Sequence, residues 1–484
     1  MTKLNFILKN SWPKLAWVCR INISEDSAII LHGPAVEIFE NWAVEAVWDK
    51  DFEKGDFDKT DIIFGSGIRK RCDKLIFVSS STVVDRLWHV SMDGKIFVSN
   101  TLPGLLTVAE LSLLYDYPNY ASDMASIIMK GLYRYKKNIP TNGPDINILY
   151  FNNLVWTNGL LEIIEKPDYS PMFNDFTTYK NYLETVAHNI GKNANSKSRT
   201  YPIGMLTGLS SGYDSVATSV ISRHAGCNKA VSIENSSSFW RGSDSGQHIA
   251  KKLGFICEVV KHDKNKYQNE IYSWAATGLS GGRNQHLFNY PKPLCLFFGG
   301  YFGDTIWNRK KQNLIEPKGS TTSFCEFRLL EGIFVSVVPW WGIKHAAEIQ
   351  KINLLEEMKP WTLGTDYDRP IARRLAEEAG INRGDFAIRK KDTASNFSPL
   401  LWPSTGSARA SFKSFLKSIK IKPLSDFQVY ILEVFYKILN LAYKNTIKNF
   451  GVRKWWRPWL NSPGRNLVFI WANHELKKKY SLKE

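Results

Sequence analysis

Residues 208–219 read GLSSGYDSVATS and lie between an apolar run and a stretch with the apolar spacing of a helix. In an open parallel sheet, ligands bind beyond the carboxyl ends of the strands, where helix N-termini present free N–H groups. Gly212 would let the backbone approach an anion closely, and Ser210, Ser211 and Ser215 would add hydroxyl donors. The turn therefore predicts a phosphate pocket, with simple N-capping of the helix as the structural alternative.

Two aspartates follow expected strands in the same way. A carboxylate beside a polyphosphate is repelled unless a divalent cation lies between them, so Asp214 is a candidate Mg²⁺ ligand. A second glycine-rich turn, FFGGYFGDTIW at 297–307, places Asp304 after another apolar run. No Gly-Lys-Ser/Thr follows the first turn, which excludes a Walker A loop. The two aspartates are suited to a Mg²⁺-bound pyrophosphate group.

The hydrophobic periodicity of the chain changes near residue 176. Upstream of it, short strands alternate with turns, and a helical stretch, ELSLLYDY, begins at residue 110. The dipeptides Asp93-Gly94 and Asn158-Gly159 favour tight hairpins. Downstream, apolar strands alternate with amphipathic helices, which predicts an α/β fold with a doubly wound parallel sheet. We expect three regions. Residues 1–175 form a sheet-rich α+β domain, residues 176–400 form an α/β domain, and residues 401–484 form a basic, aromatic, helical extension.

Composition narrows the class of protein. The 484 residues carry a net charge of +17, and 44% of them are hydrophobic, with no uninterrupted apolar run long enough to span a membrane. The N-terminus lacks the apolar core of a signal peptide. Six scattered cysteines form no CxxC pair and no zinc-ligand spacing, which favours reduced thiols and a cytoplasmic location. Residues 401–484 hold 16 Lys and Arg against 4 Asp and Glu, so most of the charge lies there.

LSSGYDS at 209–215 resembles the S-G-G-x-D-S pyrophosphate loop of the N-type ATP pyrophosphatases. The layout of the chain resembles the asparagine synthetase and β-lactam synthetase superfamily, in which an Ntn-hydrolase-like glutaminase domain precedes an ATP pyrophosphatase domain. Ser211 and Thr305 depart from the glycine and the glutamate usual in asparagine synthetases. The resemblance implies ATP and Mg²⁺ as cofactors and Asp214 and Asp304 as metal ligands. The ATP-binding residues that it implies are Leu209, Ser210, Ser211, Gly212, Asp214, Ser215 and Ser232.

The resemblance also suggests catalytic residues. Tyr301 stands where β-lactam synthetases have a tyrosine that pairs with a later glutamate to deprotonate the attacking amine, and Glu331 is the candidate partner. A tyrosine that only packs the loop is the alternative. AIRKKDTAS at 387–395 resembles the late loop of the family with its catalytic lysine, which implies Lys391 or, failing it, Lys390. Two solvated surface lysines are the alternative there.

RLWHVSMDGKIFVSNTLPGLL at 86–106 resembles the hairpin of the glutaminase domain of this family. Such glutaminases use a cysteine directly after the initiator methionine, where this chain has Thr2, so we expect a degenerate glutaminase domain. The function implied is an AMP-forming amide ligase that adenylates a carboxylate and condenses it with an amine or ammonia, in surface polysaccharide or secondary-metabolite biosynthesis. A tRNA-modifying enzyme with the same loop and an inactive binding protein are the alternatives.

The basic extension has three interpretations. It contains the apolar helical stretch FQVYILEVFYKILNLAY at 427–443 and the tryptophans Trp455, Trp456 and Trp459. It could contact an anionic membrane surface, or it could bind an anionic glycan or nucleic acid. The apolar spacing favours a third interpretation, in which the helix docks on the body of the protein while its lysines remain in water.

Overall fold

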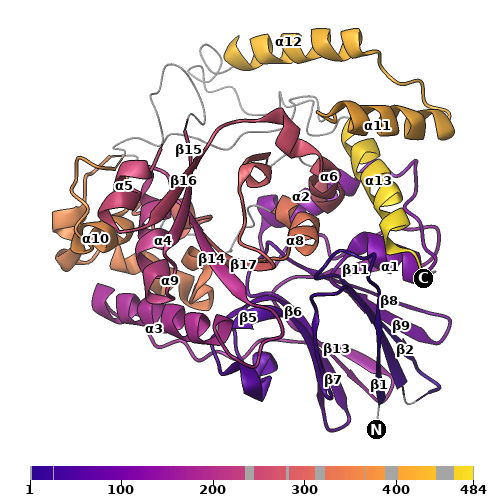
Figure 1. Ribbon diagram of the computed structural model, residues 1–484, viewed down its shortest axis with the longest axis horizontal. Coiled ribbons are helices and arrows are strands. Elements are labelled where there is room, and N and C mark those ends of the chain that lie inside the picture. Colours follow the sequence, from indigo (N-terminus) through magenta and orange to yellow (C-terminus); the bar gives the residue numbers. More distant parts are fainter. Residues whose placement is uncertain are drawn as a thin grey trace.

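The computed structural model describes residues 3–25, 27–234, 245–278, 283–310, 322–365, 367–386, 402–442 and 463–482. In these ranges the chain is a mixed α/β protein with two largely antiparallel sheets and one parallel sheet. Figure 1 shows the antiparallel sheets at the bottom and the parallel sheet above and beside them. The coarse expectation of an α/β protein with a parallel sheet is confirmed.

The two antiparallel sheets come from the first part of the chain. The first sheet has the order β1-β3-β2-β9-β8-β11-β10 and consists of β1 (Lys3–Leu8), β2 (Trp17–Asn22), β3 (Ser27–His32), β8 (Leu87–Met92), β9 (Lys95–Ser99), β10 (Asn138–Ile139) and β11 (Ile146–Leu149). The second has the order β13-β12-β7-β6-β5-β4 and consists of β4 (Glu37–Phe39), β5 (Trp42–Trp48), β6 (Ile63–Arg71), β7 (Lys74–Val78), β12 (Asn153–Thr157) and β13 (Leu160–Ile164). Alternating apolar residues of both sheets, among them Trp17, Ile30, Ile68 and Phe77, share one buried cluster, so the sheets pack face to face.

Both predicted hairpins are present. Asp93 and Gly94 join β8 to β9 with φ of 48° and 69°, and Asn158 and Gly159 join β12 to β13 with φ of 49° and 87°. A two-residue type I′ turn needs positive φ at both central positions, which Asn-Gly and Asp-Gly tolerate best. Local sequence therefore determined both of these turns.

The helical stretch predicted from Glu110 onward begins only at Tyr120. Glu110 itself has a φ of 57°, just after α1 (Leu102–Val108), and the next helix, α2 (Tyr120–Lys130), begins after Pro118. A left-handed residue and a proline both interrupt helical hydrogen bonding, so the apolar spacing between them leads to no helix.

The parallel sheet has the order β16-β15-β14-β17-β18 and consists of β14 (Ile203–Gly208), β15 (Lys229–Ile233), β16 (Ile256–Val260), β17 (Leu294–Gly299) and β18 (Ile333–Val337). Strand order reverses between β14 and β17, which pair directly with each other. In open parallel sheets, ligands bind at such a point, in the crevice outside the carboxyl ends of the strands. The helices of this part are α3 (Phe176–Ala194), α4 (Tyr213–His224), α5 (Gln247–Lys252), α6 (Glu270–Thr277), α7 (Gly303–Ile306), α8 (Cys325–Glu331), α9 (Ala346–Ile352) and α10 (Pro370–Glu378).

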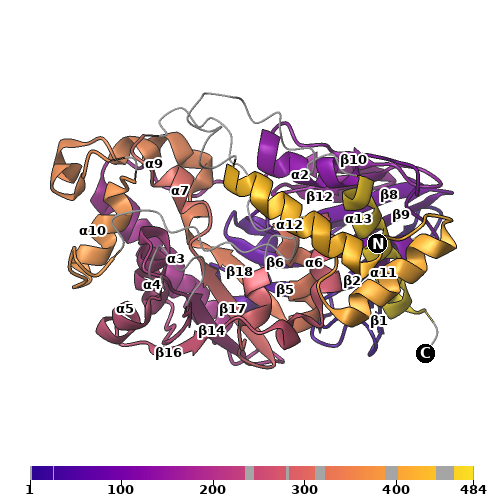
Figure 2. The same cartoon turned by 90° about the horizontal axis from the view of Figure 1, so that it is seen from above.

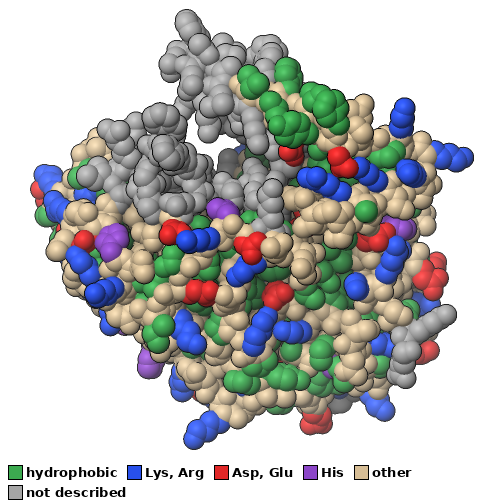
Figure 3. Space-filling view, turned by 45° about the horizontal axis from the view of Figure 1, so that its top comes forward, with side chains coloured by type: hydrophobic (Ala, Val, Ile, Leu, Met, Phe, Trp, Pro, Cys, Tyr) green, Lys and Arg blue, Asp and Glu red, His purple; other side chains and the backbone are tan. Residues whose placement is uncertain are grey.

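The C-terminal part does not behave as one surface appendage. It contains α11 (Gly406–Ser418), α12 (Asp426–Ala442) and α13 (Pro463–Lys477). Helix α13 packs against α6 and buries Phe469 and Trp471 completely. Helix α12 instead runs along the outside of the molecule (Figure 2), with hydrophobic side chains gathered on its surface (Figure 3). The tryptophans at 455, 456 and 459 lie outside the described residues.

The structure also bears on the expectations about membrane spans and cysteines. None of the helices in the described ranges combines the length and apolarity needed to cross a lipid bilayer. All six cysteines have free thiols, and four of them are buried.

Candidate functional site

The serine turn joins β14 to α4 at the carboxyl edge of the parallel sheet. The Ser210 backbone N–H donates to Ser215 Oγ over 3.1 Å, and the two hydroxyl oxygens lie 2.9 Å apart. The Gly212 N–H donates to Ser210 Oγ over 3.2 Å, and Gly212 caps a helix that begins at Tyr213. The turn thus gathers two hydroxyls in front of a helix N-terminus, which is a suitable arrangement for anionic oxygens.

The other predicted nucleotide-binding residues lie around this turn. The Leu209 N–H donates to the Val231 carbonyl over 2.9 Å, which extends the contact between β14 and β15. Ser211 is buried within the turn. Ser232 lies on β15 and is buried, and its hydroxyl accepts from the Gly246 N–H over 2.8 Å. These residues therefore lie beside the serine turn, at the carboxyl ends of β14 and β15.

The two glycine-rich loops meet in the structure. A Cβ atom added at Gly300 would lie 2.6 Å from the Asp214 carbonyl oxygen, and one added at Gly303 would lie 2.6 Å from Asp214 Cγ. The loop after β17 therefore abuts the first turn of α4 so closely that only glycine fits at both positions. Asp304 directly follows Gly303 and is half-buried. Folding thus brings the loops that carry Asp214 and Asp304 to one place.

Arg369 is a part of the site that the sequence did not predict. Its Nη1 donates to Asp214 Oδ2, and its side chain is only 3% exposed. Its guanidinium carbon lies 4.6 Å from the ring centre of Tyr367, and that ring stacks on Tyr213 at 4.8 Å. The segment before α10 consequently covers the serine turn. No spacing or pattern in this segment marks one arginine above the others nearby.

A metal ion at this site would need ligands beyond the two aspartates. Within the ranges that the structure describes, no group of three or more His, Cys, Asp or Glu side chains is placed to hold a metal ion. Asp214 and Asp304 fit Mg²⁺ only if phosphate oxygens of a bound nucleotide complete its coordination, which is the usual way that Mg²⁺ binds beside a polyphosphate.

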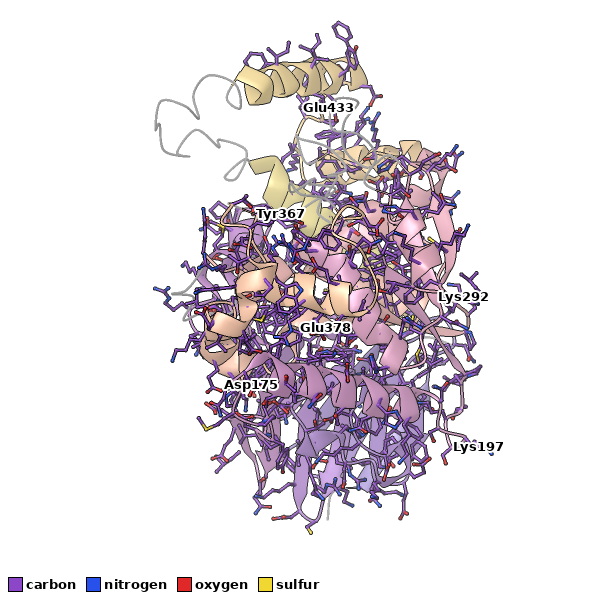
Figure 4. All side chains as sticks on the ribbon, turned by 90° about the vertical axis from the view of Figure 1, so that its left-hand side faces the viewer. Asp175, Lys197, Lys292, Tyr367, Glu378 and Glu433 are labelled. Carbon is purple, nitrogen blue, oxygen red and sulfur yellow. The ribbon has the colours of Figure 1, made fainter. Side chains whose placement is uncertain are left out.

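The predicted pair of Tyr301 and Glu331 is wrong. Tyr301 follows the carboxyl end of β17, whereas Glu331 precedes the amino end of the neighbouring parallel strand β18, so the two residues flank opposite edges of the sheet. The Glu331 carboxylate accepts from Lys292 Nζ over 2.6 Å. Figure 4 shows Lys292 well away from Tyr367, which covers the serine turn.

The surroundings of Tyr301 do not favour its ionisation. Its ring lies against Gly299, where an added Cβ would be 2.5 Å from Tyr301 Cε2. Burial raises the pKa of Tyr301 to about 12, and a hydrogen bond from the Gln285 side chain offsets only part of this effect. Tyr301 therefore stays protonated at neutral pH.

Lys390 and Lys391, the candidates for the catalytic lysine, lie outside the described residues. The chain matches no model of a known protein family, and a search of curated proteins finds no significant match either. The function must therefore be inferred from the chemistry of the two loops after β14 and β17.

Proposed function

We propose that this protein is an ATP-dependent, AMP-forming ligase that activates a carboxylate and joins it to an amine or to ammonia. The observation that carries the proposal is the contact of the two loops after β14 and β17, in which Gly300 and Gly303 lie against Asp214. This contact joins a serine-rich helix N-terminus to a second acidic loop at the switch point of a parallel sheet, where such sheets bind nucleotides.

The residues of the crevice fit an ATP–Mg²⁺ complex. N–H groups in the first turn of the 12-residue helix α4, together with the hydroxyls of Ser210 and Ser215, would hold phosphate oxygens. Asp214 and Asp304 would hold the cation. Bound ATP would supply the phosphorus that the carboxylate attacks and the pyrophosphate that leaves. Arg369 holds the Asp214 carboxylate in the crevice, so an incoming cation competes with its guanidinium for that carboxylate.

The nitrogen side of the reaction needs a donor and a base. We assign no base to Tyr301 and Glu331, because Glu331 pairs with Lys292 and Tyr301 stays protonated. The proposal includes a degenerate glutaminase domain in the two antiparallel sheets, with the nitrogen coming from a substrate amine or from free ammonia. In this proposal the two antiparallel sheets have a structural role and pack against the part of the chain that contains the parallel sheet.

The test is pyrophosphate release from ATP and Mg²⁺ with a panel of carboxylates, with and without amines. Asp214→Ala is expected to lower the carboxylate-dependent rate by about 100-fold or more, the scale of losing one preorganised electrostatic group. Glu331→Gln serves as the matched control and is expected to stay within about twofold of the wild type, because its carboxylate lies at the other edge of the sheet.

Three outcomes would count against the proposal. If RNA alone drives pyrophosphate release, the protein belongs to the tRNA-modifying class. If nucleotide binds but no carboxylate in the panel drives release, the ligase proposal fails. If Glu331→Gln loses as much activity as Asp214→Ala, the carboxylate of Glu331 takes part in the reaction and the separation argued from the strand register is wrong.

A further inference from the structure

Helix α12 exposes an apolar stripe to solvent. Phe427, Tyr430, Ile431 and Ile438 are 71%, 64%, 49% and 58% exposed. Their spacing of three, four and eleven residues from Phe427 places them on one side of an α-helix over three turns. Large apolar side chains gathered in this way on a soluble surface mark an interaction site.

The ends of this part of the chain are fixed to the body of the protein. Buried Glu270 accepts hydrogen bonds from the backbone N–H groups of Ser404 and Thr405, just before α11. Past α13, the Tyr480 hydroxyl hydrogen-bonds that of Thr101 over 2.9 Å. Helix α12 lies between these two anchors in the chain, at the top edge of the molecule in Figure 1 and in front of the body in the view from above (Figure 2).

The predicted docking of this helix on the body is confirmed only near its start, at Val429. Val429 is 2% exposed and faces the protein, whereas the stripe on the other side of the helix stays in water. Docking therefore explains the position of Val429 and leaves the outer stripe without an explanation.

Cationic side chains lie next to the stripe in the chain. Lys417, Lys420 and Lys422 are exposed, and within the described part of the chain the structure records no ion pair for any of them. Lys413 by contrast pairs with Asp426 at the start of α12. An apolar helix face that closely follows these cations in the chain offers the apolar and the cationic contacts that a surface with both acyl chains and negative charge takes.

We propose that α12 binds the surface of an anionic membrane, with its apolar stripe among the lipid chains and the lysines before it at the headgroups. A nucleic acid would engage the lysines but would leave the stripe in water. The inference does not depend on the ligase proposal, because no residue of the crevice takes part in it.

The test is flotation of the full chain with vesicles of phosphatidylcholine, with and without phosphatidylserine. We expect flotation only with the anionic vesicles, and weaker flotation at higher salt. Ile431→Asp should reduce the bound fraction at least about tenfold, because a carboxylate cannot enter the lipid chains. Lys417→Gln and Lys422→Gln should each weaken binding by about fivefold, the effect of one cation near an anionic surface.

The control is Leu160→Asp, at a residue of β13 that is 68% exposed. Figure 1 shows β13 at the end of the molecule opposite to α12. This variant should float like the wild type. The proposal is overturned if the wild-type chain floats with neither type of vesicle, or if Ile431→Asp floats as well as the control. It is also overturned if the wild-type chain has the mass of a dimer in solution and Ile431→Asp has the mass of a monomer. The last result would assign the stripe to a homodimer.

Discussion

The contact between the two loops predicts a large effect of one methyl group at Gly300. A Cβ there would lie 2.6 Å from the Asp214 carbonyl oxygen, whereas ordinary Cβ contacts begin at 3.4 Å, so the loops must separate by about 0.8 Å in Gly300→Ala. The opposing atom belongs to the backbone of α4 and cannot rotate away. Overpacking of this kind typically lowers the free energy of unfolding by about 1–3 kcal/mol. The same shift displaces Asp214, so the rate of pyrophosphate release should fall even under conditions in which the variant remains fully folded.

The measurement is chemical denaturation of Gly300→Ala beside a matched glycine variant, with pyrophosphate release assayed on the folded proteins. Gly406→Ala is the control, since Gly406 is the first residue of α11 and an added Cβ meets nothing within 4 Å. Alanine should leave stability there unchanged or raise it, by up to about 1 kcal/mol. Equal stability and equal activity in the two variants would refute the close approach of the loops, and with it the structural basis of the proposed site.

Two further predictions concern buried charges away from the crevice. Arg328 donates to both Glu45 and Asp85, and all three side chains are almost fully buried. Arg328→Met should therefore lower the free energy of unfolding by about 3–5 kcal/mol, because two buried carboxylates lose their cation. Lys192→Met breaks only an exposed ion pair, with Asp51, and should leave the denaturation midpoint unchanged. If both variants had similar midpoints, the stabilising role of buried Arg328 would be contradicted. Burial lowers the pKa of His286 to about 3, so the folded state binds fewer protons than the unfolded state between about pH 3 and 6.5, and stability should fall as the pH drops through this window. In His286→Phe the slope of unfolding free energy against pH should be shallower there by up to about 1.4 kcal/mol per pH unit, and an unchanged slope would exclude His286 as its source.

Local sequence was a good guide where one short segment determines its own conformation. Asn158-Gly159 and Asp93-Gly94 form the expected hairpins because few other residues tolerate two successive positive φ values. The strand, serine turn and helix around Gly212 also follow the prediction, since the apolar run, the cap and the helical spacing are adjacent in the chain. No helix begins at Glu110, although the apolar spacing there is helical, because Glu110 has a positive φ and Pro118 interrupts helical hydrogen bonding.

Contacts between distant segments were predictable only in part. The two glycine-rich turns implied that Asp214 and Asp304 share an edge of the sheet, because parallel strands end on the same side. The pairing of Glu331 with Lys292, and that of Arg369 with Asp214, depend on the register of β17 with β18 and on the path of the chain before α10. Neither of these is encoded in residue spacing.

The sequence by itself determined the alternation of strands and helices, the hairpin turns and the position of the serine turn before α4, because each depends on backbone preferences within a few residues. Only the tertiary structure decided which side chains meet. Gly300 lies against Asp214, Glu331 is removed from Tyr301, and the stripe of α12 remains in solvent. The physical reason is that burial and ion pairing are properties of the packed chain, in which a residue's neighbours in space are set by sheet order and helix anchoring.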